Sequence, residues 1–232
     1  MGGNSNTHQD SIERALKAAA ARYIGAHPTF RWYALLKYRM DPCYRAIGQR
    51  VSKDSFTVDL GTGLGMLPVL LGELGERRRV LGIEWDQERM RCGQHAARGL
   101  PDVEVVKGDL HASPIPACNF ITLIDVLHYY EADKQEALLR RCREALRPGG
   151  RLLLREGDAS RRGGARWTRI VEWCATRWGW NRGPVVRFRP VSELRGTLVK
   201  LGFHVTESEL ASWFLPGNVL LVAELDERLQ SR

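Results

Sequence analysis

The chain has 232 residues, of which 44% are hydrophobic and 27% are charged, and its formal net charge at pH 7 is +8. This composition is ordinary for a globular protein, and the length fits one large α/β domain with additions. No apolar run approaches the roughly 18 residues of a membrane span, and residues 1–10 lack the basic-then-apolar pattern of a secretion signal. Five widely spaced cysteines without a Cys-x-x-Cys pair favour reduced thiols over a zinc site or disulfides. We therefore expect a cytoplasmic protein.

Residues 1–52 predict a helical extension ahead of the main domain. Asp10 stands where a helix N-cap is expected, for a helix that runs to about Tyr23. His27-Pro28 breaks that helix, because proline disfavours helical backbone in the residue before it. Asp41-Pro42 starts another helix, with aspartate as the cap and proline in the first turn.

A loop with three glycines at every second position follows an apolar stretch, in the sequence Asp59-Leu60-Gly61-Thr62-Gly63-Leu64-Gly65. Glycine lets the backbone turn tightly and lets a ligand approach it closely. A helix expected from about Met66 would present unpaired N–H groups and a partial positive charge to this loop. This arrangement suits a carboxylate or a phosphate. It is not the dinucleotide fingerprint, which requires glycine at position 66.

Short apolar strands alternate with helical segments after the loop, which predicts a parallel sheet covered on both faces. Ligands of such sheets bind beyond the carboxyl ends of the strands. Glu84, Asp109 and Asp125 each end or follow a strand, so they would lie there beside the glycine loop. Glu84 is expected to accept hydrogen bonds from two ribose hydroxyls, and Trp85 to lie flat on an adenine. The predicted strands cover residues 79–84, 103–107, 119–125 and 147–155.

This set of motifs resembles the class I S-adenosylmethionine-dependent methyltransferases, from about Phe56 to Ala223. The resemblance implies a Rossmann-like α/β fold, with a seven-stranded, mostly parallel sheet whose last strand is antiparallel, flanked by helices. It also implies S-adenosyl-L-methionine as cofactor and S-adenosyl-L-homocysteine as product. The residues that carry it are Asp59-x-Gly61-x-Gly63-x-Gly65, Glu84, Gly108-Asp109, Asp125 and Leu146-Arg147-Pro148-Gly149-Gly150.

The resemblance assigns a part of the cofactor to each motif. The glycine loop would cradle the methionine part, Glu84 would hold the ribose, and Asp109 would meet the adenine amino group. The region of Asp125 would lie near the methyl group. The predicted cofactor-binding residues are Asp59, Gly61, Thr62, Gly63, Gly65, Glu84, Trp85, Asp109, Leu110 and Asp125.

A narrower similarity is to the methyltransferases of aryl-polyene and xanthomonadin-type pigment pathways. It rests on four segments and implies a small-molecule acceptor in secondary metabolism, a 4-hydroxyaryl acid that is free or bound to an acyl carrier protein. The acid at position 156 departs from the pattern of that family. The four segments are Tyr38–Pro42, Ile124–Tyr129, Leu154–Ala159 and Gly217–Val222.

Methyl transfer to a phenol gains from a base that removes the hydroxyl proton. His128 is predicted to be that base or to orient the acceptor, because histidine suits proton transfer at neutral pH. The alternative is a histidine that bonds a loop carbonyl and only shapes the pocket. Tyr129 is predicted to stack on the acceptor or donate to it, with core packing as the alternative. Arg155 is predicted to hold a carboxylate or stabilise a phenolate, with an ion pair to Glu156 or Asp158 as the alternative.

The methyltransferase domain is expected over residues 53–226, with a helical insertion at about 160–190 over the acceptor site. Nine arginines and no lysine between Arg155 and Arg189 raise a second hypothesis, the methylation of RNA. Nucleic acid is disfavoured because no RNA-binding module is recognisable. A third hypothesis is a cofactor-binding, non-catalytic partner subunit. No pattern of metal ligands is present in the sequence.

Overall fold

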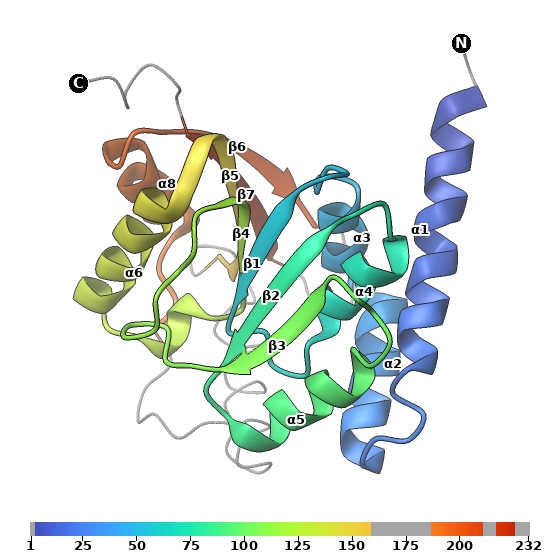
Figure 1. Cartoon of the computed structure of the whole chain (residues 1–232). Coiled ribbons are helices and arrows are strands. Elements are labelled where there is room, and N and C mark those ends of the chain that lie inside the picture. Colours follow the sequence, from blue (N-terminus) through green and yellow to red (C-terminus); the bar gives the residue numbers. More distant parts are fainter. Residues whose placement is uncertain (1–2, 159–186, 211–216, 226–232) are drawn as a thin grey trace. The chain divides into compact units, whose positions relative to one another are not determined.

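The structure is a computed structural model that describes residues 3–158, 187–210 and 217–225 (Figure 1). The chain divides into two compact units, Met1–Thr122 and Leu123–Arg232, and each is described by itself. The predicted insertion at about 160–190 lies outside the described residues except for its last four positions.

Seven strands form one sheet in the order β3-β2-β1-β4-β5-β7-β6, which confirms the Rossmann-like architecture expected from the sequence. Strands β1, β2 and β3 pair in parallel, with Val58 of β1 opposite Leu81 of β2. Strand β7 runs antiparallel to both β5 and β6, as expected for the last strand. The strands are β1 (Phe56–Leu60), β2 (Arg79–Glu84), β3 (Val103–Lys107), β4 (Cys118–Ile124), β5 (Leu146–Gly157), β6 (Phe203–Glu209) and β7 (Asn218–Leu225).

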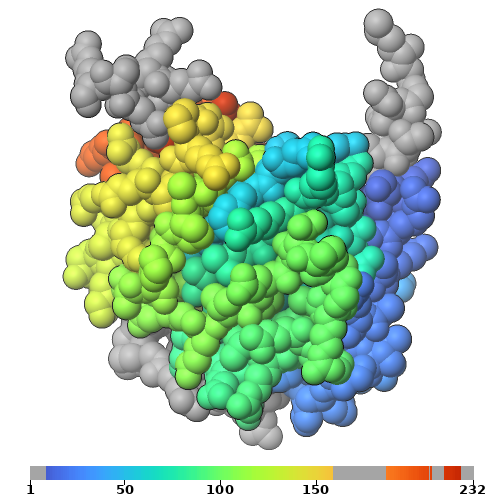
Figure 2. Space-filling model, in the orientation of Figure 1, coloured from blue at the N-terminus to red at the C-terminus, as the bar shows by residue number. Residues whose placement is uncertain are grey.

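Helix α4 (Met66–Leu74) is apolar on all sides, and seven of its nine residues are buried. A helix of this composition needs cover all round. In the first unit α4 contacts β2 and β3 and also the helices of the N-terminal extension, α1 and α3. Figure 2 shows α1 and α2 in blue beside α5 in green. The helices of this unit are α1 (Gly3–Ala21), α2 (Pro28–Met40), α3 (Pro42–Gly48), α4 and α5 (Gln87–Ala96).

Residues 3–48 contain the three helices α1, α2 and α3, and the first of them starts elsewhere than expected. Helix α1 begins at Gly3 and not at Asp10. No proline or glycine interrupts the backbone between these positions, so the helix continues through the expected cap. The break ahead of Pro28 is confirmed, because α1 ends at Ala21 and a new helix, α2, begins at Pro28. The helix start at Asp41-Pro42 is also confirmed, because the Asp41 carboxylate accepts the Cys43 N–H at 3.0 Å and caps α3.

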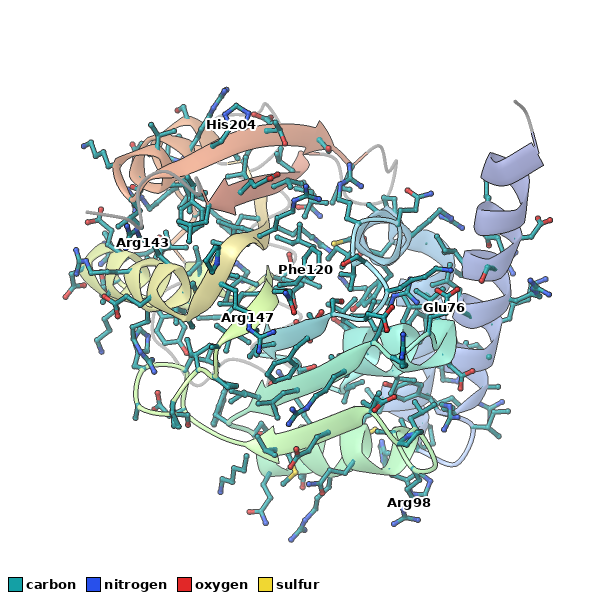
Figure 3. The ribbon with its side chains drawn as sticks, turned by 45° about the horizontal axis from the view of Figure 1, so that its top comes forward. Glu76, Arg98, Phe120, Arg143, Arg147 and His204 are labelled. Atoms are coloured by element: carbon teal, nitrogen blue, oxygen red, sulfur yellow. The ribbon has the colours of Figure 1, made fainter. Side chains whose placement is uncertain are left out.

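In the second unit, helix α6 (Ala132–Ala145) packs on β5 and helix α8 (Val191–Lys200) packs on β6 and β7. Arg143 of α6, labelled in Figure 3, donates from Nε to the carbonyl of Leu201 at the end of α8 at 2.7 Å. A short 3₁₀ helix, η1 (Leu127–Tyr129), lies between β4 and α6. Among the residues that the structure describes, no helix is long and apolar enough to cross a bilayer.

Candidate active site

The glycine loop joins β1 to α4 through three residues with left-handed backbone. Gly61, Gly63 and Gly65 have φ angles of 74°, 57° and 72°. Residues with a Cβ rarely adopt such angles, which explains glycine at all three positions. The N–H groups of Gly61 and Thr62 donate to the carbonyl of Ile83 at 2.9 and 3.1 Å, so the loop is fastened to the end of β2.

The loop also lies very close to α5. A Cβ added to Gly65 would come within 2.9 Å of the Gly93 Cα, closer than such atoms approach in proteins. A Cβ added to Gly63 would meet nothing within 4 Å. Gly65 is therefore needed for packing between loop and helix, whereas Gly63 borders open space that a ligand can fill.

Glu84 ends β2 and its side chain points back to the glycine loop. One carboxylate oxygen accepts the Gly63 N–H at 2.7 Å, and the other accepts the Asp86 N–H at 2.9 Å. Only 2% of Glu84 is exposed, and burial raises the pKa of its carboxyl despite these two hydrogen bonds. A carboxylate oxygen can accept more than one hydrogen bond, so both oxygens retain capacity for a ligand hydroxyl.

Asp59 lies inside the first unit and not at its surface. Its carboxylate accepts the Thr122 hydroxyl at 2.5 Å, and 3% of the residue is exposed. Burial raises the pKa of Asp59 to about 6, against the hydrogen bond of the Thr122 hydroxyl, which lowers it. The observed contact of Asp59 is therefore with β4 inside the unit.

The remaining predicted residues of this unit lie at the ends of β2 and β3. The Gly108 N–H donates to the carbonyl of Glu84 at 2.9 Å, which brings the two strand ends together. Asp109 is exposed, and its Oδ1 accepts the His111 N–H at 2.7 Å. Leu110 is buried, and 43% of Trp85 is exposed.

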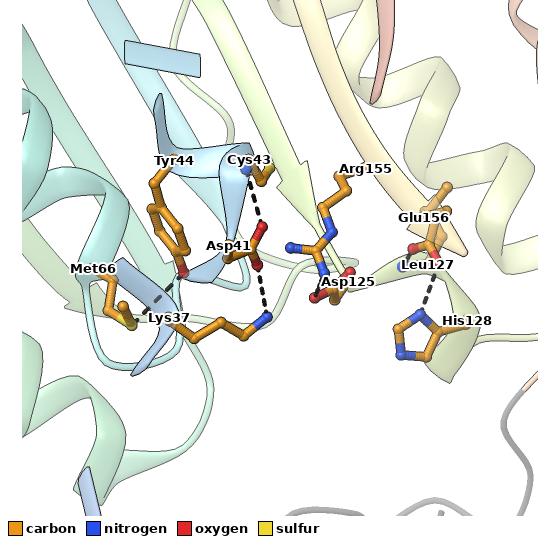
Figure 4. Close-up of polar contacts among 10 residues, drawn as sticks. All are labelled: Lys37, Asp41, Cys43, Tyr44, Met66, Asp125, Leu127, His128, Arg155 and Glu156. Carbon is orange, nitrogen blue, oxygen red and sulfur yellow. Dashed lines mark hydrogen bonds and ion pairs between the residues drawn. The ribbon is translucent and has the colours of Figure 1, made fainter. Parts of the chain in front are cut away.

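In the second unit, Asp125 and Arg155 form an ion pair at the ends of β4 and β5 (Figure 4). An Arg155 terminal nitrogen lies 2.8 Å from Asp125 Oδ2, and the Asp125 N–H donates to the Arg155 carbonyl at 3.1 Å. Asp125 has a φ of 56°, a strained angle that aspartate tolerates better than most residues. Arg155 is 2% exposed, and Asp125 is an ion-pair partner of its guanidinium.

His128 and Glu156 form a second buried pair in this unit (Figure 4). His128 Nδ1 lies 2.7 Å from Glu156 Oε2, and the other oxygen of Glu156 accepts the Leu127 N–H at 2.8 Å. Burial lowers the pKa of His128, but the charge and the hydrogen bond of Glu156 together raise it above its usual value. Because an ionised carboxylate only accepts hydrogen bonds, Nδ1 carries a proton and Nε2 of the neutral ring is the proton acceptor.

Aromatic rings surround His128. The Tyr129 ring centroid lies 4.3 Å from the His128 ring, and the Phe188 centroid lies 4.6 Å from it. The Arg187 N–H donates to the His128 carbonyl at 2.7 Å and holds the segment of Phe188 in place. Tyr129 is 41% exposed, which argues against the core-packing alternative.

Sequence reasoning missed Glu156 as the partner of His128. The available signal was that His128 follows β4 and Glu156 lies near the end of β5, the next strand in the chain. Among the described residues, no cluster of three or more histidine, cysteine, aspartate or glutamate side chains could hold a metal ion.

The cofactor-site residues of the first unit fit S-adenosylmethionine. The loop has room over Gly63, and α4 offers helix N-terminal N–H groups for the carboxylate of the methionine part. Glu84 is a buried carboxylate with capacity for ribose hydroxyls, and Trp85, the next residue, is partly exposed. Asp109 keeps an exposed carboxylate at the end of β3.

Comparisons with known proteins agree with this fit. Residues 57–150 match the family model described as a methyltransferase domain. Acetylserotonin O-methyltransferase of Mus musculus is 39% identical over 103 residues, which are 44% of this chain and 26% of that protein. The carboxy-S-adenosyl-L-methionine synthase of Colwellia psychrerythraea is 26% identical over 120 residues, 49% of each chain. The chain thus spans at most about half of the length of these curated relatives.

A solved structure with a similar fold is the magnesium protoporphyrin IX methyltransferase of Synechocystis PCC 6803 with bound SAH. Its TM-score is 0.66 at 15% identity, with 97% of this chain and 100% of that chain covered. Residues 57–150 therefore form a methyltransferase domain, and the fold of the chain is that of the S-adenosylmethionine-dependent methyltransferases. The cofactor of such a domain is S-adenosyl-L-methionine, which methyl transfer converts to S-adenosyl-L-homocysteine.

Proposed function

We propose that this protein transfers a methyl group to the hydroxyl of a small aromatic acceptor, with His128 as the base. The buried His128–Glu156 hydrogen bond of 2.7 Å is the observation that carries the proposal. Glu156 keeps the proton on Nδ1, so that Nε2 is left to accept the proton of the acceptor. Carboxylates fix the tautomer and the orientation of a catalytic histidine in the same way in other enzymes.

The protein has two tasks in this reaction, to hold the acceptor in line with the methyl group and to supply a base. Bound S-adenosylmethionine supplies a methyl group on a sulfonium, which is already electrophilic. His128 takes the hydroxyl proton on Nε2, while Glu156 stabilises the charged ring that results. Because Glu156 raises the pKa of His128, the proton is accepted more readily than by a solvent-exposed histidine.

The rings of Tyr129 and Phe188 favour an aromatic acceptor, because both lie within stacking distance of the His128 ring. We infer a 4-hydroxyaryl acid, free or bound to an acyl carrier protein, and a place in secondary metabolism. Arg155 would contribute by fixing Asp125, its ion-pair partner, and Tyr129 by contacting the acceptor. The O-methyltransferase activity in the name of the mouse relative is consistent with a hydroxyl acceptor.

The test is transfer of label from methyl-labelled S-adenosylmethionine into a mixture that is fractionated afterwards. The mixture holds 4-hydroxyaryl acids, the same aryl groups on an acyl carrier protein, and total RNA. Label in an aryl fraction supports the proposal and shows whether the carrier is required. Label in RNA overturns it, and so does conversion of S-adenosylmethionine itself without transfer to an acceptor. Cofactor binding without any reaction favours the non-catalytic hypothesis.

Variants at the proposed base make this test specific. His128→Ala should lower turnover by about 10²- to 10⁴-fold, the usual contribution of a general base, with little change in cofactor affinity. Glu131→Gln is the matched control, because Glu131 is a half-exposed acid that pairs with Arg187. If turnover and cofactor affinity fall together in His128→Ala, His128 is not the base but part of the structure or of the cofactor site.

A further inference from the structure

Three tyrosines of the N-terminal extension converge at the start of α4. Tyr23 follows α1, Tyr38 belongs to α2 and Tyr44 belongs to α3, so each helical segment contributes one. All three are buried, with at most 7% of each residue exposed. Their rings form a series, with centroids 6.2 Å apart from Tyr23 to Tyr38 and 5.3 Å apart from Tyr38 to Tyr44.

Two of the hydroxyls bind the backbone on either side of Gly65. The Tyr23 hydroxyl donates to the Leu64 carbonyl at 2.9 Å, and the Tyr38 hydroxyl donates to the Met66 carbonyl at 2.7 Å. The Tyr44 hydroxyl instead contacts the sulfur of Met66 at 3.7 Å (Figure 4). The cluster therefore combines two donors to the loop backbone with one donor to a side chain.

The Leu64 carbonyl depends on this arrangement. Leu64 precedes Gly65, the N-cap of α4, so its carbonyl lies outside the hydrogen-bond ladder of the helix. The residue four positions later is Pro68, which has no N–H to offer. On the α5 side the carbonyl lies against Gly93, whose added Cβ would come within 3.1 Å of it. The Tyr23 hydroxyl thus donates a hydrogen bond to the Leu64 carbonyl, for which α4 provides no N–H donor.

Fixing these two carbonyls also fixes two N–H groups, because each peptide unit is planar. The Leu64 carbonyl shares its plane with the Gly65 N–H, which donates to the Thr62 carbonyl at 3.0 Å and closes the loop. The Met66 carbonyl shares its plane with the N–H of Leu67, one of the N–H groups that the first turn of α4 leaves without a partner in the helix. Such groups bind carboxylates.

We propose that Tyr23 and Tyr38 are positioning residues that set the affinity of the glycine loop for the amino-acid end of S-adenosylmethionine. The extension then acts on the cofactor through the loop backbone. Burial raises the pKa of both phenols far above 10, so both hydroxyls remain protonated donors throughout the working pH range. The proposal concerns the cofactor alone and stands or falls independently of the acceptor and of His128.

The test compares the variants Tyr23→Phe and Tyr38→Phe in the full chain by calorimetric titration. The probes are S-adenosylmethionine and 5′-methylthioadenosine, which has the same nucleoside and no amino-acid end. Each variant should raise the Kd for S-adenosylmethionine by about five- to tenfold, the worth of one hydrogen bond, and leave the Kd for 5′-methylthioadenosine within about twofold. Tyr44→Phe is the matched control, with both Kd values within about twofold of wild type.

Two results would overturn the proposal. Equal weakening of both probes would mean that the tyrosines only support the fold, because a general loss of structure affects the nucleoside and the amino-acid end alike. An unchanged Kd for S-adenosylmethionine in Tyr23→Phe and Tyr38→Phe would mean that the loop holds its shape without them. Phenylalanine keeps the ring and its packing, and urea unfolding of each variant verifies that the titrated protein is folded.

Discussion

Both carboxylate oxygens of Glu84 accept hydrogen bonds from backbone N–H groups in the protein without a ligand. It joins the Gly63 N–H to the Asp86 N–H, so it shapes the loop as well as facing the ribose in the predicted complex. The two backbone hydrogen bonds explain why a buried acid is tolerated here in spite of its raised pKa.

Glu84→Ala should raise the Kd for S-adenosylmethionine by at least about tenfold, because each hydrogen bond to a charged acceptor contributes about 1.5–3 kcal/mol. The measurement is equilibrium titration with the cofactor. Glu88→Ala is the control, since Glu88 is an exposed acid in the first turn of α5. Unchanged affinity in Glu84→Ala would refute the ribose-binding role.

The pairing of His128 with Glu156 predicts a pH profile. A base must be neutral, so kcat should rise with pH through a pKa above 6.5, the usual histidine value. Glu156→Gln removes the charge that raises this pKa, and the ascending limb should move to lower pH. The pH dependence of kcat under saturating substrates measures both values. A limb that stays in place in Glu156→Gln would assign the titration to another group.

The same pair also affects stability, with the opposite dependence on pH. The pKa of His128 is higher in the folded state than in the unfolded state. The charged histidine therefore adds to the free energy of unfolding in full below about pH 6.5, and this contribution is lost as the pH rises through the folded-state pKa. Protein with neutral His128 is therefore the reactive form, and protein with charged His128 is the more stable form.

The glycine loop approaches α5 backbone to backbone, at Gly65 and Gly93. Gly65→Ala should lower the free energy of unfolding by about 2–4 kcal/mol, since it adds a steric clash with Gly93 to the cost of a left-handed angle. Gly63→Ala has a similar angle and open space, so it should cost only about 1 kcal/mol. Urea unfolding without cofactor compares them, and equal losses would contradict the packing argument.

The strands and their ends were predictable from the sequence, because short apolar runs that end in acids leave few other arrangements. Strands β2 and β3 have the predicted bounds, and β4 is shifted by one residue. The start of α1 was not predictable from Asp10, because a favourable cap residue does not stop a helix whose preceding residues also allow it.

The side-chain pairs of the site were less predictable than the strands that carry them. His128 and Glu156 are 28 residues apart, and no local sequence pattern predicts which acid a histidine will contact at this separation. The aromatic residues of the extension were recognisable as a group, but the direction of each hydroxyl depends on how α1, α2 and α3 pack on α4. These contacts arise from tertiary packing, which a single sequence does not state.

The ionisation of the buried Asp59 carboxyl affects the stability of the fold. Its pKa is raised by burial to about 6 from an ordinary value of 3.8, so the folded state binds a proton that the unfolded state has released. Stability should therefore fall as pH rises from about 4 to about 6, by about 3 kcal/mol in total for this group. Glu84 acts in the same direction, because its pKa is also raised.

The difference between wild type and Asp59→Asn isolates this contribution. Asparagine keeps an oxygen for the Thr122 hydroxyl and does not ionise, so the variant should lose less stability than wild type over this pH range. Unfolding by urea at pH 4, 5, 6 and 7 provides the comparison. Parallel curves for the two proteins would show that Asp59 does not titrate in the folded state.

The contacts of the extension have a consequence for biosynthesis. Tyr23 and Tyr38 leave the ribosome before Leu64 and Met66, their partners 41 and 28 residues later in the chain. The contacts of α1 and α3 with α4 can form only after α4 has been synthesised. They can form while β5, which carries Glu156, is still untranslated. The order of translation thus favours a cofactor loop that is assembled before the residues proposed for chemistry exist.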